Sequence, residues 1–229
     1  MISKVKLGLL LMMIGAAIVG VLWNPIFVGL PGGEEKIVPR EAGKWHIGKG
    51  AEYNPTMQYL VTTDKMTFSA KLEFFTDPNL QKEMISVEIE DPKVGTKLTQ
   101  TIPIGPGFTF DKISDEIKPY FSTLDQTIFS IRDLAIEDKY LVTKAVWGRT
   151  FVGQVAKEIA VTNYSKTSFT FGSANAYTIS YMIGEKESKI WIVDNLPLPA
   201  KAEIYDIDGK LQYSYELSSL AAPSTPGLS

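Results

Sequence analysis

The sequence has no cysteine and a single histidine, His46, among its 229 residues. The lack of cysteine excludes disulfides, thiolate metal ligands and thiol nucleophiles. A zinc site or a Ser-His-Asp relay would have to use His46, and no Gly-x-Ser-x-Gly turn is present. We therefore expect no catalytic residue, no metal ligand and no cofactor. The remaining enzymatic alternative is an envelope enzyme that uses only carboxylates and tyrosines.

An excess of charge of one sign is also missing. The chain carries 23 basic and 26 acidic residues, for a net charge of −3, and they are scattered singly. Proteins that bind nucleic acid usually gather lysine and arginine into a stripe that neutralises phosphates. We therefore expect no nucleic-acid partner.

One long hydrophobic run is present, because no charged residue occurs between Leu7 and Gly33. A helix needs about 20 apolar residues to cross a bilayer, so we predict a transmembrane helix over residues 7–30 that contacts the lipid bilayer. Two lysines precede the run and two glutamates follow it. The positive-inside rule then places residues 1–6 in the cytoplasm and the C-terminal domain outside the cell membrane, which makes this a single-pass protein.

The alternative interpretation of the same run is a cleaved signal peptide. Such a peptide has an apolar stretch of about 7 to 15 residues that ends in small residues at a cleavage site. Here the stretch is longer, and Trp23–Phe27 at its end offers no such site. The sequence favours a retained anchor.

Beyond the anchor, we expect a linker over residues 31–42, an extracytoplasmic β-rich domain over 43–220 and a disordered tail over 221–229. Alternation of apolar and polar residues predicts strands, since side chains along a strand point to opposite faces. Residues 190–193 are apolar throughout, which predicts a central strand buried on both faces. The other expected strands are 66–74, 85–90, 177–183 and 211–217, and, with a weaker pattern, 56–62, 96–103, 150–162, 167–171 and 200–206.

One segment has a different periodicity. Over residues 113–134 the apolar side chains recur every three or four positions, which indicates a helix with one buried face. Pro119 is expected to divide it near its start. The predicted fold class is α+β and mainly β: an N-terminal transmembrane helix followed by a curved antiparallel sheet with one or two covering helices.

Two kinds of candidate site follow from this arrangement. Asn163-Tyr164-Ser165 is an acceptor sequence for N-glycosylation, at Asn163. Aromatic and aliphatic side chains of the helix and of the last strands are candidates to face an apolar ligand held between sheet and helix. They are Phe121, Leu124, Ile128, Trp191, Tyr213 and Tyr215.

Three motifs resemble those of membrane-anchored proteins from ammonia-oxidising archaea (Thaumarchaeota). They are residues 45–50 (Trp-His-Ile-Gly-Lys-Gly), Trp147-Gly148, and residues 190–203, which begin Ile-Trp-Ile-Val-Asp-Asn-Leu-Pro. This resemblance covers most of residues 43–217 and implies an anchored surface protein without assigning an activity. The order of strands and helix is also faintly similar to the half-barrels of lipoprotein carriers, in which a curved sheet closed by helices holds acyl chains.

These expectations lead to two hypotheses of function. The first is a membrane-tethered, non-catalytic extracytoplasmic domain that binds a partner protein of the membrane or surface, or a component of the cell envelope. The second is a carrier or binder of an apolar ligand, such as a lipid, between the concave sheet and its helix. A concave face with an apolar cavity would favour the second hypothesis.

Overall fold

The structure is a computed structural model, and it describes residues 43–221. The predicted anchor at 7–30, the linker at 31–42 and the tail, except for Ala221, lie outside the described residues. Within residues 43–221, no helix is long and apolar enough to cross a membrane.

Eleven strands form one antiparallel sheet in the order β6-β5-β4-β3-β2-β13-β12-β11-β10-β9-β8. A small second sheet pairs β1 with β7. The strand bounds are β1 (Gly43–Trp45), β2 (Thr56–Thr63), β3 (Thr67–Asp77), β4 (Lys82–Asp91), β5 (Thr96–Gly105), β6 (Thr109–Phe110), β7 (Lys139–Leu141), β8 (Val146–Val152), β9 (Val155–Phe169), β10 (Gly172–Ile183), β11 (Lys186–Val193), β12 (Lys201–Tyr205) and β13 (Leu211–Ala221). The helical elements are η1 (Ala51–Tyr53), α2 (Lys118–Gln126) and η2 (Arg132–Leu134).

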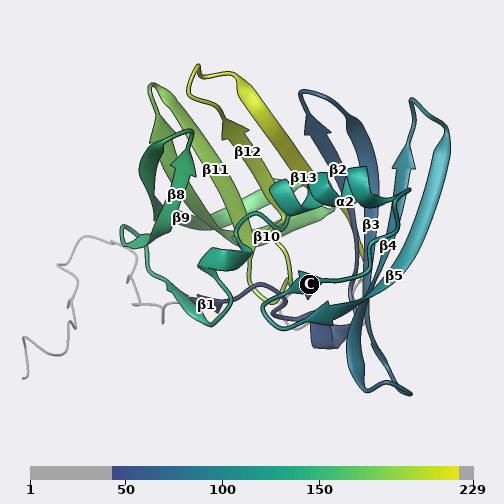
Figure 1. Cartoon of the computed structure of the whole chain (residues 1–229). Helices are drawn as coiled ribbons and strands as arrows, with labels where there is room; N and C mark the ends of the chain where they lie inside the picture. Colours follow the sequence, from purple (N-terminus) through teal and green to yellow (C-terminus); the bar gives the residue numbers. More distant parts are fainter. Residues whose placement is uncertain (1–42, 222–229) are drawn as a thin grey trace, which may run out of the picture. The chain divides into compact units, whose positions relative to one another are not determined.

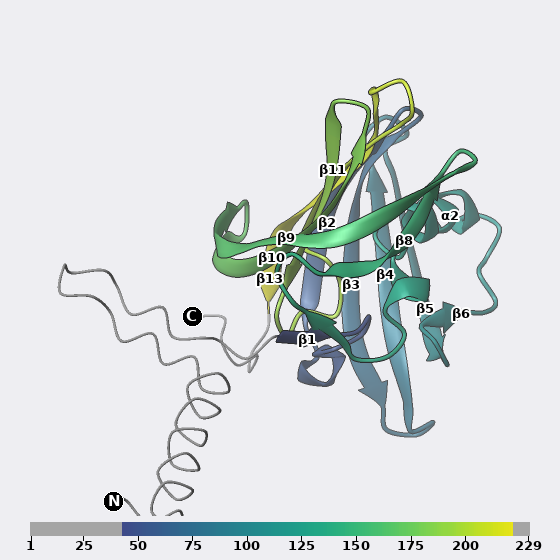
Figure 2. The ribbon, with the colours of Figure 1, turned by 90° about the vertical axis from the view of Figure 1, so that its left-hand side faces the viewer.

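The large sheet is strongly curved, and α2 crosses its concave side (Figure 1). A view from the side places α2 and β6 on the same side of the sheet (Figure 2). Directly opposed residues of antiparallel strands lie on one face. The register places Phe68, Val61, Tyr215, Ala202 and Ile190 in one row across five strands, and all of them are buried. The concave face is therefore the hydrophobic face.

The curved antiparallel sheet and its mainly β character were predicted, and the structure confirms both. Two expected strands were wrong in detail. The run at 150–162 is a hairpin, because Gly153 adopts φ 59° in a two-residue turn between β8 and β9. The run at 167–171 is the end of β9 followed by a turn. Strand β11 is central as expected, but its convex face carries the half-buried Trp191, so that face is only partly covered.

The predicted helical segment 113–134 is also shorter than expected. The α-helix covers only Lys118–Gln126, with Pro119 in its first turn. After Thr127 the chain continues through tight turns, in which Ser130 N–H donates to the Thr127 carbonyl and Arg132 N–H to the Phe129 carbonyl. Such turns also repeat about every three residues, so they keep the apolar positions on one face and imitate a longer helix in the sequence.

Candidate functional site

The concave side of the sheet consists of two different halves. In the half formed by β2 to β6, the underside of α2 is filled by a phenylalanine cluster, which we define as Phe74, Phe108, Phe110, Phe121 and Phe129. Ring centroids within this cluster lie 5.0 to 6.3 Å apart. Rings at these separations pack as in an ordinary protein core. This half is therefore solid.

The predicted ligand-facing residues of the helical segment belong to this solid half. Leu124 and Ile128 are fully buried, and Phe121 is 6% exposed. Tyr120 packs edge-on against Phe68 of β3, and its hydroxyl donates to Asp91 of β4 over 2.9 Å. These contacts attach α2 to the sheet, and the phenylalanine cluster fills the space directly beneath the helix.

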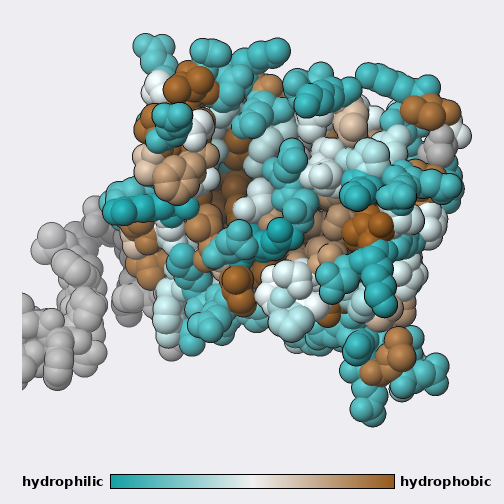
Figure 3. All heavy atoms as spheres, viewed as in Figure 1, coloured by the Kyte–Doolittle hydropathy of each residue, from teal (hydrophilic) through white to brown (hydrophobic). Residues whose placement is uncertain are grey.

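The other half, in front of β10 to β13, is open. An open cleft of about 310 Å³ lies between the end of α2, the tip of the β8–β9 hairpin and the β12–β13 hairpin. Its floor is formed by Tyr181, Ile204 and Tyr213. Figure 3, in the same view as Figure 1, shows a hollow with a hydrophobic floor beside the helix. The polar residues that line the cleft are Gln126, Ser130, Thr150, Asp206 and Gln212.

A second hollow of about 300 Å³ continues on the other side of Gln126. The two hollows share Gln126, Gln212 and Tyr213. Met66 and Thr123 belong to the second hollow alone. Together the hollows form a groove that runs along the C-terminal end of α2.

The two hairpins at the rim of the open cleft present apolar side chains to solvent. Phe151 of β8 is 74% exposed, and Ile207 in the β12–β13 turn is 64% exposed. The latter turn is rigid, because the Asp206 carboxylate accepts hydrogen bonds from the backbone N–H groups of Asp208 and Lys210, over 3.0 and 2.9 Å. Gly209 takes φ 74° in the same turn. Ile207 is thus held in its exposed position by local structure.

Tyrosine hydroxyls supply the polar groups beneath the cleft. The hydroxyls of Tyr213 and Ser130 lie 3.3 Å apart, and burial raises the pKa of Tyr213. Tyr215 packs parallel to Tyr213, with ring centroids 6.4 Å apart. Its hydroxyl is buried and has no hydrogen-bond partner among the described residues, and burial raises its pKa well above the ordinary value. Both hydroxyls are therefore neutral at physiological pH, and only that of Tyr213 has a described hydrogen-bond contact.

The remaining predicted residues lie elsewhere. Trp191 neighbours Ile190 along β11, so it points to the convex face, where Lys201 lies over its ring at 5.5 Å. It does not line the open cleft. Asn163 is exposed on β9, and its side-chain amide donates to the Ser165 hydroxyl over 3.1 Å. Its glycosylation stays a prediction.

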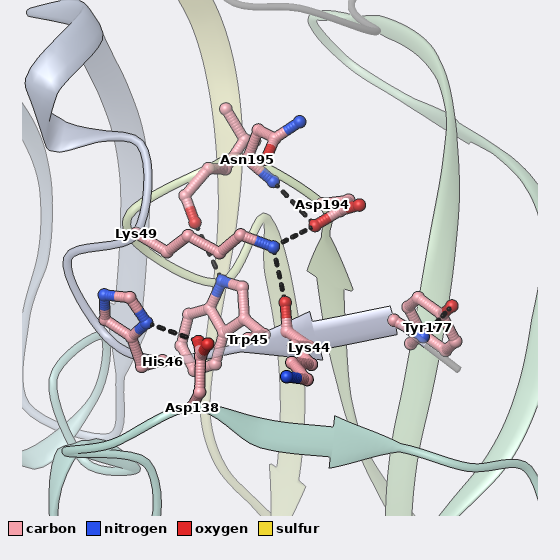
Figure 4. A network of polar contacts seen from close by, with 10 residues as sticks. Lys44, Trp45, His46, Lys49, Asp138, Tyr177, Asp194 and Asn195 are labelled. Atoms are coloured by element: carbon pink, nitrogen blue, oxygen red, sulfur yellow. Dashed lines mark hydrogen bonds and ion pairs between the residues drawn. The ribbon is translucent and has the colours of Figure 1, made fainter. Parts of the chain in front are cut away.

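Residues of the three motifs that carry the archaeal resemblance meet beside β1, and Figure 4 shows those of the first and the third motif. The Trp45 indole N–H donates to the Leu196 carbonyl over 2.8 Å, and the Lys49 ammonium pairs with Asp194 at 2.7 Å. Trp147 packs against Trp45 with ring centroids 6.4 Å apart. Gly50 is required there, because a Cβ atom would collide with the Asn195 carbonyl oxygen. This basal cluster ties the start of the domain to the loop after β11.

His46, the lone histidine, belongs to the edge of the basal cluster. Its Nδ1–H donates to the Asp138 carboxylate over 2.8 Å, and this hydrogen bond lowers the pKa of Asp138. Both side chains are more than one third exposed. Across residues 43–221, no group of three or more His, Asp or Glu side chains is arranged to hold a metal ion. The two side chains form an exposed hydrogen-bonded pair beside the basal cluster.

Several residues of the open cleft were not predicted. Phe151 was assigned only to a predicted strand, Ile207 fell between two predicted strands, and Gln126 and Gln212 were not singled out. One signal was present, since Ile207 interrupts an otherwise polar turn, Asp206 to Lys210. Phe151 gave no comparable signal, because its exposure depends on the position of β8 at the end of the sheet.

An open antiparallel half-barrel with one helix on its concave side is the class of structure that these residues define. No protein-family model matches the sequence, and no curated protein sequence matches it. Among solved structures, the chain is similar to MucB in complex with MucA(peri), at a TM-score of 0.46 and 8% identity over 80% of this chain. The chain spans 55% of the length of that MucB chain.

Two further solved structures show a weaker similarity. One is a predicted lipoprotein from Parabacteroides distasonis, with a TM-score of 0.35 and 11% identity over 77% of this chain and 99% of that one. The other is a predicted exported protein with a YmcC-like fold from Bacteroides fragilis, with a TM-score of 0.34 and 10% identity over 78% and 100%. TM-scores this low do not establish a common function.

Proposed function

We propose that this chain is a membrane-tethered, non-catalytic extracytoplasmic domain that binds a segment of a partner protein in its open cleft. The observation that carries the proposal is the position of Phe151 and Ile207, two exposed apolar side chains on opposite hairpins at the rim of a cleft with an aromatic floor. Exposed aromatic side chains beside a concave surface are typical anchors of protein interfaces.

The open shape of the groove favours a polypeptide over a lipid. A pocket for an apolar small molecule encloses most of the ligand surface and typically measures about 300–1,000 Å³. The open cleft measures about 310 Å³ and the second hollow about 300 Å³, and both are open to solvent along one side. Gln126, Ser130 and Gln212 add hydrogen-bonding groups at its wall. A row of side chains from a polypeptide can use such a surface, whereas an acyl chain would leave much of its length in water.

The filled half of the half-barrel supports the same choice. A lipid held directly beneath α2 would need the space that the phenylalanine cluster occupies, so the hollows that remain lie at the C-terminal end of the helix. The predicted anchor at residues 7–30 would keep the domain close to the membrane. A partner in the membrane or the envelope would then be met at a high local concentration.

Site-specific photo-crosslinking of the full chain in the membranes of its source cells tests the proposal. A photo-reactive phenylalanine analogue replaces Phe151, Ile207 or, as a matched control, Val94, which is exposed in the turn between β4 and β5. We expect the same discrete protein adduct from positions 151 and 207 and none from position 94. Equal products from all three positions would contradict the proposal. A lipid adduct at 151 and 207 would establish the apolar-ligand alternative instead.

A further inference from the structure

The outer edge of β8 is one end of the large sheet. Strands β8 and β9 are joined by the two-residue turn Gly153-Gln154, and Val152 opposes Val155 across it. A two-residue turn makes its flanking residues a hydrogen-bonded pair, and such pairs alternate along antiparallel strands. The backbone groups of Val152 and Thr150 therefore point to β9. Those of Arg149 and Phe151 point away from the sheet.

These outward backbone groups are unpaired in the part of the chain that the structure describes. Within residues 43–221, no backbone or side-chain hydrogen bond reaches the N–H or carbonyl of Arg149 or Phe151 from outside the β8–β9 hairpin. An unpaired edge of this kind is a template for another strand, and natural proteins usually cover it. Leu134 and Lys139 lie against one face of β8 at Gly148. The free backbone groups are those of Arg149 and Phe151.

The opposite end of the sheet is covered by the chain itself. Strand β6 pairs with Ile104 and Gly105 at the end of β5. Further along β5, the Gln100 side-chain amide donates to the Lys112 carbonyl over 2.8 Å and accepts from Ser114 N–H over 3.0 Å. One edge of the same sheet is thus blocked, whereas the edge beside the open cleft is not.

The charges near β8 indicate which kind of strand could pair with it. Lys139, Arg149 and Lys157 lie along this end of the sheet, with Glu158 paired to Arg149 at 3.1 Å. Asp206 in the cleft wall adds a second carboxylate, so three cations against two carboxylates leave a small positive excess, which favours an acidic partner. In a second copy of β8 the same excess of positive charge would face itself, and the register that pairs Arg149 with Arg149 would be destabilised by like charges.

We propose that the partner binds in an extended conformation, as an acidic segment that adds a strand to the free edge of β8. This inference rests on the proposed function and specifies how the partner is held. Backbone hydrogen bonds to Arg149 and Phe151 fix the segment. Alternate side chains of the segment then point toward the open cleft, where Thr150 and Val152 already lie, and toward the opposite face, which Arg149 shares with Phe151 at the rim.

Two substitutions of Arg149 distinguish the contribution of its backbone N–H to binding from that of its side chain. Arg149→Pro removes the outward N–H and leaves the hydrogen bonds to β9 intact, whereas Arg149→Ala removes only the side chain. The probe is a displayed library of random peptides of about ten residues, selected on the full chain in detergent. We expect proline-poor, acidic sequences with alternating apolar residues. Arg149→Pro should weaken their binding about tenfold relative to Arg149→Ala, the loss of about one hydrogen bond.

A second measurement avoids any question of misfolding. Selected peptides are resynthesised with N-methyl groups at alternate positions, which block their backbone donors without changing the protein. One of the two methylation patterns should abolish binding, and hydrogen exchange should slow at the amides of Arg149 and Phe151. Binding that tolerates Arg149→Pro and both patterns, yet is lost in Ile207→Ser, would overturn strand addition and leave the proposed function standing. Peptides insensitive to all of these changes, or the absence of any selected peptide, would overturn both.

Discussion

The filled and open halves of the half-barrel use different aromatic residues for different purposes. Under α2 the aromatic side chains are phenylalanines that contact one another and exclude solvent. In front of β10 to β13 they are tyrosines, with hydroxyls that lie beneath or beside a cleft. One continuous sheet thus combines a stabilising core in one half with a surface that remains available for recognition in the other.

The largest expected difference in stability comes from removing one phenylalanine side chain in each half. Phe129 is fully buried in the phenylalanine cluster, and its removal in Phe129→Ala should lower the free energy of unfolding by about 3–5 kcal/mol. Phe151 is 74% exposed, so Phe151→Ala should change stability by no more than about 0.5 kcal/mol. Urea unfolding of the two variants measures both values. Similar losses would remove the distinction between the halves.

The two tryptophans of the base offer a second matched pair. Trp45→Phe removes an indole N–H that donates to the Leu196 carbonyl, which leaves that carbonyl without its donor and should cost about 1–3 kcal/mol. The Trp147 indole N–H is buried without a hydrogen-bond partner among the described residues. Trp147→Phe should therefore cost less than Trp45→Phe. Equal losses in thermal unfolding would show that packing, and not the hydrogen bond, fixes the basal cluster.

The tyrosines of the concave face should show a smaller contrast. The Tyr59 hydroxyl donates to the Pro199 carbonyl over 3.0 Å, so Tyr59→Phe should cost about 1 kcal/mol. The Tyr215 hydroxyl has no such partner within residues 43–221, and Tyr215→Phe should be neutral or stabilising. A clear destabilisation by Tyr215→Phe would indicate that the hydroxyl is satisfied by water, which chemical denaturation can detect.

The smallest effect is expected at the exposed pair of His46 and Asp138. The hydrogen bond from His46 lowers the pKa of Asp138, so the native state favours the ionised carboxylate. Its contribution is present above the unfolded pKa of about 3.9 and is lost as the pH falls through the lower native value. Asp138→Asn should lower the urea midpoint slightly at pH 7 and not at strongly acidic pH, and His46→Gln should do the same at pH 7. A difference that persists in acid would exclude this electrostatic origin.

Much of the fold follows from the sequence, because period-two alternation depends on local burial alone. Strands β3, β4 and β13 were predicted for this reason, and a curved sheet with a covering helix follows from their number and from the one amphipathic segment. The split of residues 150–162 was missed, since Val-Gly-Gln-Val can continue a strand unless Gly153 adopts a positive φ. The length of α2 was overestimated because the turns after Thr127 repeat with nearly the helical period.

The candidate site was harder to predict than the fold. Tyr213 was expected to face an apolar ligand and does line the open cleft, whereas Trp191 points to the convex face. Sequence periodicity predicts which side chains share a face of a strand, but it does not predict which strand lies at the end of the sheet. The exposure of Phe151 could therefore not be predicted. The contact between Lys49 and Asp194 joins residues 145 positions apart, and spacing alone does not predict such a contact.

The double variant Phe151→Ser with Ile207→Ser tests the central claim most directly. Both side chains are largely exposed, so unfolding in urea should remain within about 1 kcal/mol of the unmodified protein. Binding of the partner identified by crosslinking, measured on the full chain in detergent, should fall by about tenfold or more, as for the loss of interface anchors. Unchanged binding by a variant that folds normally would contradict the assignment of the open cleft as the recognition surface.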